Sequence, residues 1–330
     1  MTGLGGMTGR IVRQFETGYQ RTLITVDADR NHRWTRLPGT DRGSALHGPS
    51  PAVAAALAGL AYGGVRVALA TGAAGGGVSY PAPGSGTAAG LALSHPEGPD
   101  LDRLAWALTG TGGLLRRIQA AAPADIAAAG PAGPARALAW MRTGGGPRAA
   151  AVLHRELRRS LGAARWDELM RWCAALARPS TPPPARGDVL LHGAAGMGQV
   201  VLAEEPPDAA DEPAAPGPAS AALLVGEDIA RGPADFDLGW LLGELVELRA
   251  LAAGQGRRPE FPGVARAAVL AGAGGLTDPV QAGRAAVLRM LVHAHDFAAY
   301  VGWHPDLLVH LRALPDLVDT GGDGVLTEPW

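Results

Sequence analysis

Apolar residues along this chain recur with two different spacings, and the change falls about a third of the way along. Residues 10–37 contain three runs rich in β-branched and aromatic residues, with a polar DADRN turn between the second and the third. Such runs predict a β-meander. Residues 50–62 predict a helix, with Ser50 as its cap and Pro51 at its first position. VRVALA at 65–70 predicts a further strand.

The next segment is dominated by glycine and short apolar groups. Residues 72–86 predict a loop or hairpin tip, and residues 90–99 predict one more strand followed by a turn. Together with the meander, these segments predict a small sheet that carries one helix. We assign this small lobe to residues 1–94 and expect a hinge between Ser94 and Gly98.

Beyond the hinge, apolar residues recur at helical spacing. A helix is predicted at 101–121, with interruptions at its glycines, and helical spacing returns at 134–142, 148–161, 164–177, 236–254 and 278–315. Two short apolar strands, at 188–193 and 221–228, lie on either side of a polar, proline-rich insertion at 203–220 that we expect to be mobile. The pattern predicts an α+β fold in which residues 95–330 form a larger, mainly helical lobe.

Composition and charge exclude several classes of protein. Hydrophobic residues make up 47% of the 330 residues and charged residues 18%, which is a globular composition. The formal net charge of −2 gives no electrostatic basis for binding nucleic acid or an acidic membrane surface. Cys173 is the only cysteine, so a disulfide framework within the chain is excluded. No apolar run is long enough to span a membrane, and the N-terminus does not resemble a signal peptide, so a cytoplasmic location is expected.

One stretch of the chain carries a recognisable motif. It reads HGAAGMGQVVL at 192–202 and continues as ALLVGEDIARGPADFDLGWLLGEL at 222–245. In order and spacing it resembles the aminoglycoside and choline phosphotransferase-like kinases, which carry HGDxxxxN on a loop, then a hairpin, then IDWE or IDFE and a helix opened by FDLA. LLRRIQAAAP at 114–123 is similar to the family's LLRRLHAAP segment. The resemblance implies a two-lobed protein-kinase-like fold.

The side chains that phosphoryl transfer needs are missing at the matching positions of the loop at 190–202 and the strand at 222–228. The reaction requires bridging metal ions and a group that orients the acceptor hydroxyl. Ala194 stands where the family has its acceptor-orienting Asp, and Gln199 stands where it has a magnesium-binding Asn. The magnesium-binding Asp of the strand corresponds to Val225, or to Gly226 if the alignment slips by one residue. Neither side chain can bind a hard cation.

The small lobe shows the same loss, whereas the frame of the motif is kept. The sequence has no lysine, and Arg36 is the nearest substitute for the family's small-lobe lysine. The helix predicted at 50–62 has no acidic residue to pair with it. His192 persists, and so does Asp237, which the resemblance identifies as the helix-start Asp that ties the catalytic loop in place.

The resemblance therefore implies a pseudokinase with no catalytic residue and no cofactor. It would bind a peptide or a partner protein in its cleft or at the edge of the small lobe. Kinases that resemble this family occur in pathways for modified ribosomal peptides of the lanthipeptide or thioamide type, so by analogy a complex with a pathway enzyme is expected.

Two alternatives stay open. One is an active ATP-dependent phosphotransferase that acts on a Ser/Thr hydroxyl or a small molecule, with Gln199, Glu227 and Asp228 as magnesium ligands. The other is a small-molecule binder that uses the acceptor cleft alone. If a nucleotide binds, the turn at 16–22 is the better phosphate-loop candidate, although an ordinary hairpin turn fits that segment equally well. The candidate nucleotide contacts are Thr17, Gly18, Arg21, Arg36, Ser94 and His95.

Three further features have weaker functional readings. The segment NHRWTRL around Trp34 could pair with an extended peptide by strand addition. The arginine-rich helix at 148–166 is typical of a solvated face, and could also bind an acidic partner. His293 and His295 are two residues apart on a predicted helix, so they should point to different faces and not share a metal ion.

Overall fold

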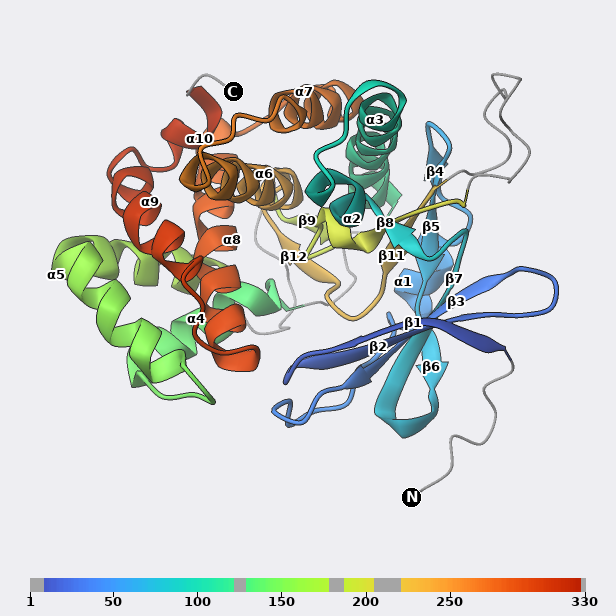
Figure 1. The fold of residues 1–330 in the computed structure, drawn as a ribbon, viewed down its shortest axis with the longest axis horizontal. Coiled ribbons are helices and arrows are strands. Elements are labelled where there is room, and N and C mark those ends of the chain that lie inside the picture. Colours follow the sequence, from blue (N-terminus) through green and yellow to red (C-terminus); the bar gives the residue numbers. More distant parts are fainter. Residues whose placement is uncertain (1–8, 122–128, 178–186, 205–220, 328–330) are drawn as a thin grey trace.

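The chain folds into a small β-rich lobe and a larger helical lobe (Figure 1), which confirms the predicted fold class. The computed structural model describes residues 9–121, 129–177, 187–204 and 221–327. Most of the predicted insertion at 203–220, and most of the proline-rich stretch at 179–187, lie outside these residues. In the part of the chain that is described, no helix is both long and apolar enough to cross a membrane.

An antiparallel sheet of five strands forms most of the small lobe, in the order β1-β2-β3-β7-β6. Its strands are β1 (Arg10–Glu16), β2 (Gln20–Val26), β3 (His32–Pro38), β6 (Thr71–Ala73) and β7 (Gly77–Ala82), with a short 3-10 turn, η1 (Ala74–Gly76), before the last. The predicted meander is confirmed. Residues 72–86 hold more than a hairpin tip, because β7 is an inner strand of this sheet.

Helix α1 (Pro51–Leu57) starts at the predicted cap, where the Ser50 hydroxyl accepts a hydrogen bond from the amide of Val53 at 3.4 Å. It ends before the predicted position, and the chain continues into β4 (Ala61–Tyr62) and β5 (Val65–Leu69). The strand predicted at 90–99 is wrong. Residues Ala88–Leu93 form helix α2, because the Thr87 side chain caps it by accepting from the amide of Gly90 at 3.1 Å.

A second five-stranded sheet, in the order β4-β5-β11-β10-β8, joins the first part of the chain to the motif strands. Strand β11 (Ala221–Val225) runs parallel to β5 and antiparallel to β10 (Val200–Leu202), which in turn pairs with β8 (Gly86–Thr87). A two-stranded sheet of β9 (Val189–Leu191) and β12 (Ala230–Gly232) closes the motif region. The motif loop therefore lies between two sheets that hold both of its ends.

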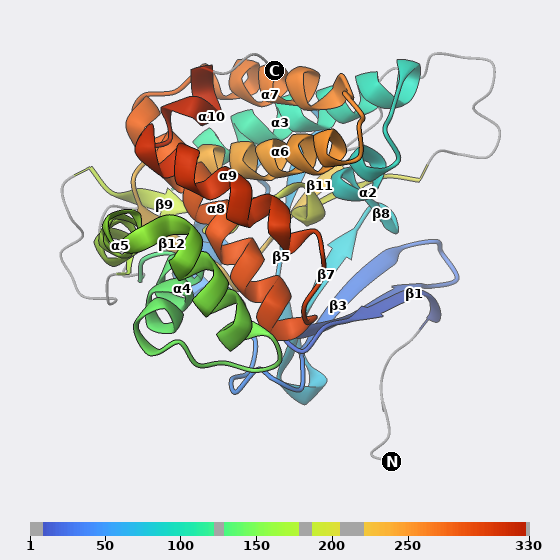
Figure 2. The ribbon, with the colours of Figure 1, turned by 60° about the vertical axis from the view of Figure 1, so that its left-hand side comes forward.

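The large lobe contains the remaining helices. They are α3 (Gly98–Ala121), α4 (Ala132–Thr143), α5 (Ala150–Leu176), α6 (Phe236–Gly254), α7 (Phe261–Ala273), α8 (Pro279–Tyr300), α9 (Leu307–Asp319) and α10 (Asp323–Thr327). Helix α7 has no counterpart among the helices predicted from the sequence. Figure 2 shows α3, α6 and α7 grouped together, with α8 and α9 running beside them. The predicted hinge at Ser94–Gly98 lies between α2 and α3, not after a strand.

Helix α3 runs without a break through the glycines that were expected to interrupt it. These glycines allow close packing. A Cβ atom at Gly112 would lie 2.2 Å from the carbonyl oxygen of Val269 in α7, and one at Gly272 would lie 1.9 Å from that of Thr109 in α3. The two helices therefore touch backbone to backbone, which a larger residue would prevent.

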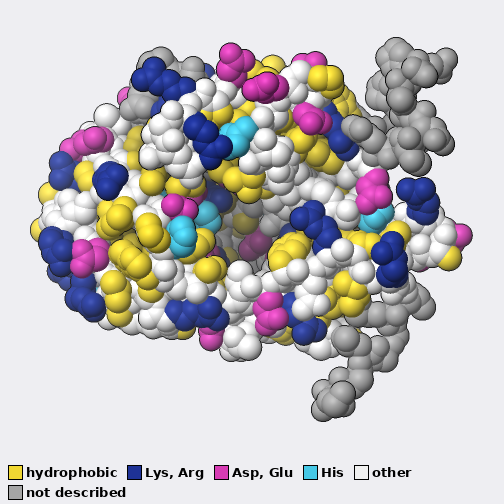
Figure 3. Space-filling model, viewed as in Figure 1, with side chains coloured by type: hydrophobic (Ala, Val, Ile, Leu, Met, Phe, Trp, Pro, Cys, Tyr) yellow, Lys and Arg dark blue, Asp and Glu magenta, His cyan; other side chains and the backbone are white. Residues whose placement is uncertain are grey.

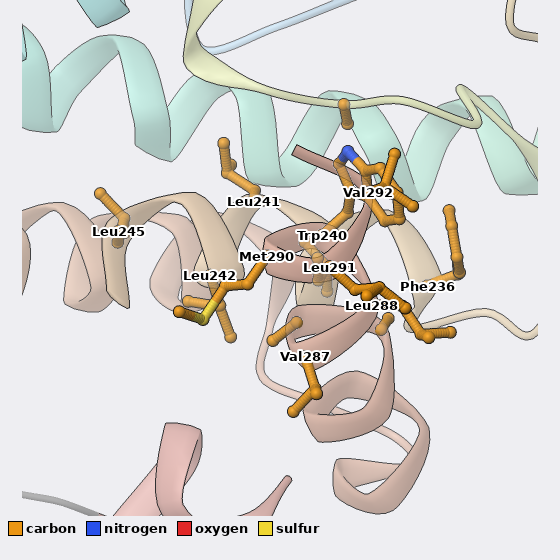
Figure 4. Packing of buried hydrophobic residues seen from close by; sticks show 14 of the residues in the cluster. Phe236, Trp240, Leu241, Leu242, Leu245, Val287, Leu288, Met290, Leu291 and Val292 are labelled. Carbon is orange, nitrogen blue, oxygen red and sulfur yellow. The ribbon is translucent and has the colours of Figure 1, made fainter. Parts of the chain in front are cut away.

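The core of the large lobe lies between α6 and α8 (Figure 4). Phe236 and Trp240 of α6 face Leu288, Leu291 and Val292 of α8, and all five are at most 5% exposed. Burial of this apolar surface stabilises the pairing of α6 and α8, the two helices that carry Asp237, Arg289 and Asp296, which are described below.

Candidate functional site

The motif loop between β9 and β10 is held by Asp237, in the first turn of α6. The backbone N–H of His192 donates to one carboxylate oxygen of Asp237 at 2.7 Å, and the N–H of Gly193 donates to the other at 2.9 Å. Asp237 is fully buried, and this burial raises the pKa of its carboxyl group although the bonds from the loop oppose the rise. Gly193 has a φ of +86°, and a Cβ atom there would lie 1.8 Å from the carbonyl oxygen of Asp228.

Both ring nitrogens of His192 are used inside the loop. Nε2 donates to the carbonyl of Leu224 at 2.8 Å, and Nδ1 accepts from the amide of Ala194 at 3.3 Å. The ring is 2% exposed. It therefore links the loop to β11 and does not present a free nitrogen to a substrate.

A cleft of about 280 Å³ lies between the lobes, beside this loop. The space-filling view shows the hollow, with basic, acidic and histidine side chains gathered around it (Figure 3). Three guanidinium groups and four carboxylates line the cleft, from Arg36, Arg136, Arg289, Glu227, Asp228, Glu244 and Asp296. Carboxylates thus outnumber guanidinium groups in the cleft.

Arg36, which was matched to the kinase lysine from the sequence, is paired with residues of the motif. Arg36 Nη1 lies 3.2 Å from Glu227 Oε1, and Arg36 Nη2 donates to Gln199 Oε1 at 2.6 Å. Arg42 Nη1 lies 3.5 Å from the other oxygen of Glu227. We call these four residues the Arg36 cluster. The side chains of Arg36 and Glu227 are each 7% exposed, so the contact is an internal ion pair between the small lobe and the motif strand.

Burial raises the pKa of Glu227, and the adjacent carboxylate of Asp228 adds to the rise, while Arg36 and Arg42 oppose it. Asp228 lines the cleft, and its carboxylate has no hydrogen bond or ion pair with the described residues. It is the one acidic group of the motif that faces the cleft without a counter-ion in that part of the chain.

The two positions that match the catalytic aspartates of the motif carry no polar side chain. Ala194 lines the cleft with a methyl group. Val225 is fully buried at the end of β11, where its carbonyl accepts from the amide of Ala70 at 2.9 Å. A Cβ atom at Gly226 would lie 2.3 Å from that of Ala70, so a slipped alignment offers no room for a ligand either.

The residues that remain do not fit a magnesium ion. Mg²⁺ is bound through carboxylate and carbonyl oxygens in nearly octahedral geometry. Gln199 Oε1 and Glu227 Oε1 both accept from Arg36, and the second oxygen of Glu227 faces Arg42. A cation at this point would lie against two guanidinium groups, which leaves Asp228 as the single acidic ligand.

The predicted nucleotide contacts are not brought together. Thr17 and Gly18 form the β1–β2 turn, whose Gly18 N–H donates to the carbonyl of Tyr300 in α8 at 2.8 Å. The Ser94 hydroxyl donates to the carbonyl of Leu91 at the end of α2, and the guanidinium of Arg257 hydrogen-bonds to the ring of His95. Neither lines the cleft, and neither does Arg21 of β2; of the predicted set, only Arg36 does.

Several residues that line the cleft lie outside the sequence motif. Arg136 of α4 lies 2.6 Å from Asp296 of α8 and places its guanidinium 4.9 Å from the ring centre of Tyr19. Burial would raise the pKa of Asp296, but Arg136 and His295 lower it to about 2. The two partners are 160 residues apart in the chain, so no local spacing could have predicted the pair.

Comparisons with known proteins find similarity among solved structures. No protein-family model matches the chain, and a search of curated proteins finds no match. Similar solved structures include an amicoumacin kinase complex with AMP-PNP and Ca²⁺ (14% identity, 93% of this chain and 88% of that chain, TM-score 0.49) and a glucosamine kinase complex (14%, 98% and 95%, 0.39). A macrolide 2′-phosphotransferase from Brachybacterium faecium is 17% identical, covering 99% and 94% at a TM-score of 0.35. The residues that line the cleft of this chain determine which ligands it can bind.

Proposed function

We propose that this chain is a catalytically inactive, kinase-like protein that binds a peptide or a partner protein and does not transfer phosphate. The observation that carries the proposal is the Arg36 cluster. Arg36, at the position of the kinase lysine, donates both to Gln199, at the position of the magnesium Asn, and to Glu227, next to the motif strand. A nucleotide would have to break a buried ion pair to reach them, and breaking such pairs is costly.

The charges of the cleft support the same proposal. Catalysis of phosphoryl transfer depends almost entirely on positioning and on charge neutralisation. Ala194 offers no group to orient an acceptor hydroxyl, and the carboxylates of the cleft outnumber its guanidinium groups. Asp228, whose carboxylate has no ion pair with the described residues, repels a triphosphate instead of stabilising its transfer.

Binding of nucleotide separates this proposal from its main alternative. Addition of ATP with Mg²⁺ should leave the melting temperature unchanged, because a ligand stabilises the folded state only if it binds that state. The measurement is a thermal shift titration of ATP with Mg²⁺, ATP with EDTA, and Mg²⁺ alone, with an active kinase of this fold as the control. A magnesium-dependent rise in melting temperature, followed by acceptor-dependent loss of ATP, would overturn the proposal.

That outcome would favour an active phosphotransferase, for which the free carboxylate of Asp228 is the supporting observation. Asp228→Asn should then abolish the magnesium-dependent shift. If instead Asp228 has no part in nucleotide binding, the variant should behave like the unaltered protein in every arm of the titration.

A free edge of the small-lobe sheet supports binding of a peptide. The segment around Trp34 was considered for strand addition, but Trp34 is buried in the inner strand β3, where its indole N–H donates to the carbonyl of Gly84 at 2.9 Å. One edge of the sheet is β1, which pairs with β2 alone among the described strands, and the other edge is the shorter strand β6. Strand β1 exposes Ile11 by 47% and Phe15 by 49%, next to Arg10 and Arg13. An extended acidic peptide fits these groups by strand addition. The analogy with modified ribosomal peptides extends the proposal to the leader of such a peptide.

We expect Phe15→Asp to weaken binding of extended acidic peptides at least tenfold, because it places a negative charge on the edge and removes an exposed ring. A fluorescence-anisotropy screen of acidic peptides against the unaltered protein supplies the probe. Val264→Asp, at a half-exposed apolar residue of α7, is the matched control and should bind like the unaltered protein. Absence of peptide binding, or equal binding by Phe15→Asp, would contradict the role of β1.

A further inference from the structure

Three potential metal-binding side chains from three different helices meet beside the cleft. They are Glu247 of α6, His293 of α8 and His310 of α9. His293 Nδ1 hydrogen-bonds to Glu247 Oε1, and His310 Nε2 lies 3.0 Å from the same oxygen. All three potential ligand atoms lie within 4.8 Å of one another. We call these residues the His–Glu–His cluster.

The distances are close to those of a bound transition-metal ion. Zinc binds histidine nitrogen and carboxylate oxygen at about 2.0–2.2 Å in a tetrahedron, which places neighbouring ligand atoms roughly 3.4 Å apart. Two histidines and one glutamate are a common set of protein ligands for an ion that keeps one position open. Small rotations of the side chains are enough to admit the ion, and His293 is free to make them because its side chain is 41% exposed.

The protonation state of the glutamate also suits a metal. Burial alone would raise the pKa of Glu247, but His293, His310 and Arg289 lower it well below its usual range, so the carboxylate is ionised. In the structure His310 Nε2 donates to Oε1 of this carboxylate at 3.0 Å, so a metal ion that takes Nε2 as a ligand displaces that proton. Metal binding at the cluster should therefore release protons and weaken as the pH falls.

The residues around the cluster orient Glu247 and leave a route by which an ion can reach it. Arg289 lies 3.4 Å from the second oxygen of Glu247, which leaves Oε1 for the ion and orients the carboxylate. The charge of Arg289 is shared with Glu244, 3.9 Å away. Glu247 and His310 are 4% exposed, whereas His293 lines the cleft, so an ion has a path from solvent to the two buried ligands.

We propose that Glu247, His293 and His310 bind a divalent transition-metal ion of the zinc class at the wall of the cleft. This site is separate from the magnesium position of a kinase, and none of the three residues belongs to the motif at 192–245. Its ligands suit a borderline-soft cation and not magnesium, because two of them are imidazoles. The proposal does not depend on whether the cleft binds a nucleotide or a peptide.

Titration of the chelator-treated protein with Zn²⁺ alone tests the site. Calorimetry should show one ion bound per chain, and a thermal shift should show a rise in melting temperature with Zn²⁺ and none with Mg²⁺. Co²⁺ should give the intense visible absorption of a four-coordinate ion. Absence of stoichiometric Zn²⁺ binding to the unaltered protein would show that the cluster is only a hydrogen-bonded link between helices.

Substitutions test whether the ion binds to these three side chains. His293→Ala changes a half-exposed side chain and should fold normally while weakening Zn²⁺ binding at least a hundredfold. Glu247→Gln should abolish binding, with circular dichroism to check its fold. His304→Ala is the control, because His304 is an exposed histidine that pairs with Asp306 outside the cluster. Zn²⁺ binding that survives in His293→Ala and Glu247→Gln would place the ion elsewhere and overturn the proposal.

Discussion

Replacing Arg36 with methionine is expected to lower the free energy of unfolding by about 3 kcal/mol at neutral pH, as for other buried ion pairs that lose one partner. The substitution leaves Glu227 in a buried position with Arg42 as its remaining counter-ion, at 3.5 Å. It also removes the donor that Gln199 Oε1 accepts from at 2.6 Å. Denaturant unfolding followed by circular dichroism measures the change.

The loss of stability in Arg36→Met should increase as the pH rises. Burial and Asp228 already raise the pKa of Glu227 above its ordinary value of 4.5, and Arg36 opposes them, so loss of Arg36 raises this pKa further. A group whose pKa is higher in the folded than in the unfolded state destabilises the folded state as pH rises through the folded pKa. The destabilisation by Arg36→Met should therefore be largest at pH 7–8 and shrink as the pH falls to about 4.5.

A second substitution tests whether the loss comes from the pair. Arg36→Met combined with Glu227→Gln removes both charges, so most of the stability and the pH dependence of the loss should return to normal. Arg33→Met is the matched control, because Arg33 is exposed on the same strand and makes one weak contact to Ser79 at 3.4 Å. An equal loss in both arginine variants, or no recovery in the double variant, would mean that the Arg36 cluster does not form in solution.

The parts of the fold that the sequence predicted are those set by contiguous patterns. The β1–β3 meander follows from the β-branched and aromatic runs and the turn that ends at Asn31, and α1 follows from Ser50 and Pro51. The strand predicted at 90–99 is wrong because the cap at Thr87, which the prediction did not include, starts α2 instead. Helix α7 was missed although Pro262 marks its first turn and Gly274 its end.

Pairings between distant segments could not be read from the sequence. Strand order in a sheet depends on long-range packing, so the sequence alone could not show that β1 forms an edge and that Trp34 lies inside. Arg36 was singled out as the lysine substitute, yet its partner Glu227 is 191 positions away and was considered only as a metal ligand of the active alternative. Similarly, His293 and His295 were examined as neighbours, whereas His293 pairs with His310 and Glu247 from other helices.

Replacing Asp237 with alanine is expected to have the largest effect of any substitution in the motif, a loss of about 3–5 kcal/mol. The variant leaves the backbone N–H groups of His192 and Gly193 buried without an acceptor, and each unsatisfied group costs about 1–3 kcal/mol. The two N–H groups donate to Asp237 at 2.7 and 2.9 Å, and among the described residues they donate to no other acceptor. Denaturant unfolding measures the loss, and hydrogen exchange at the two amides locates it.

Two control substitutions distinguish the loss of the two hydrogen bonds to the loop from the loss of a negative charge. Asp237→Asn keeps one carbonyl oxygen and should lose less than Asp237→Ala, while Asp167→Ala, at an exposed aspartate of α5, should change stability by less than about 0.5 kcal/mol. Because Asp237 holds the loop that presents Ala194, Gln199 and the Arg36 contact, its removal should also loosen the cleft without touching any ligand. Unchanged protection of the His192 and Gly193 amides in Asp237→Ala would show that β9 and β10 hold the loop by themselves, and that the surviving part of the motif has no structural role.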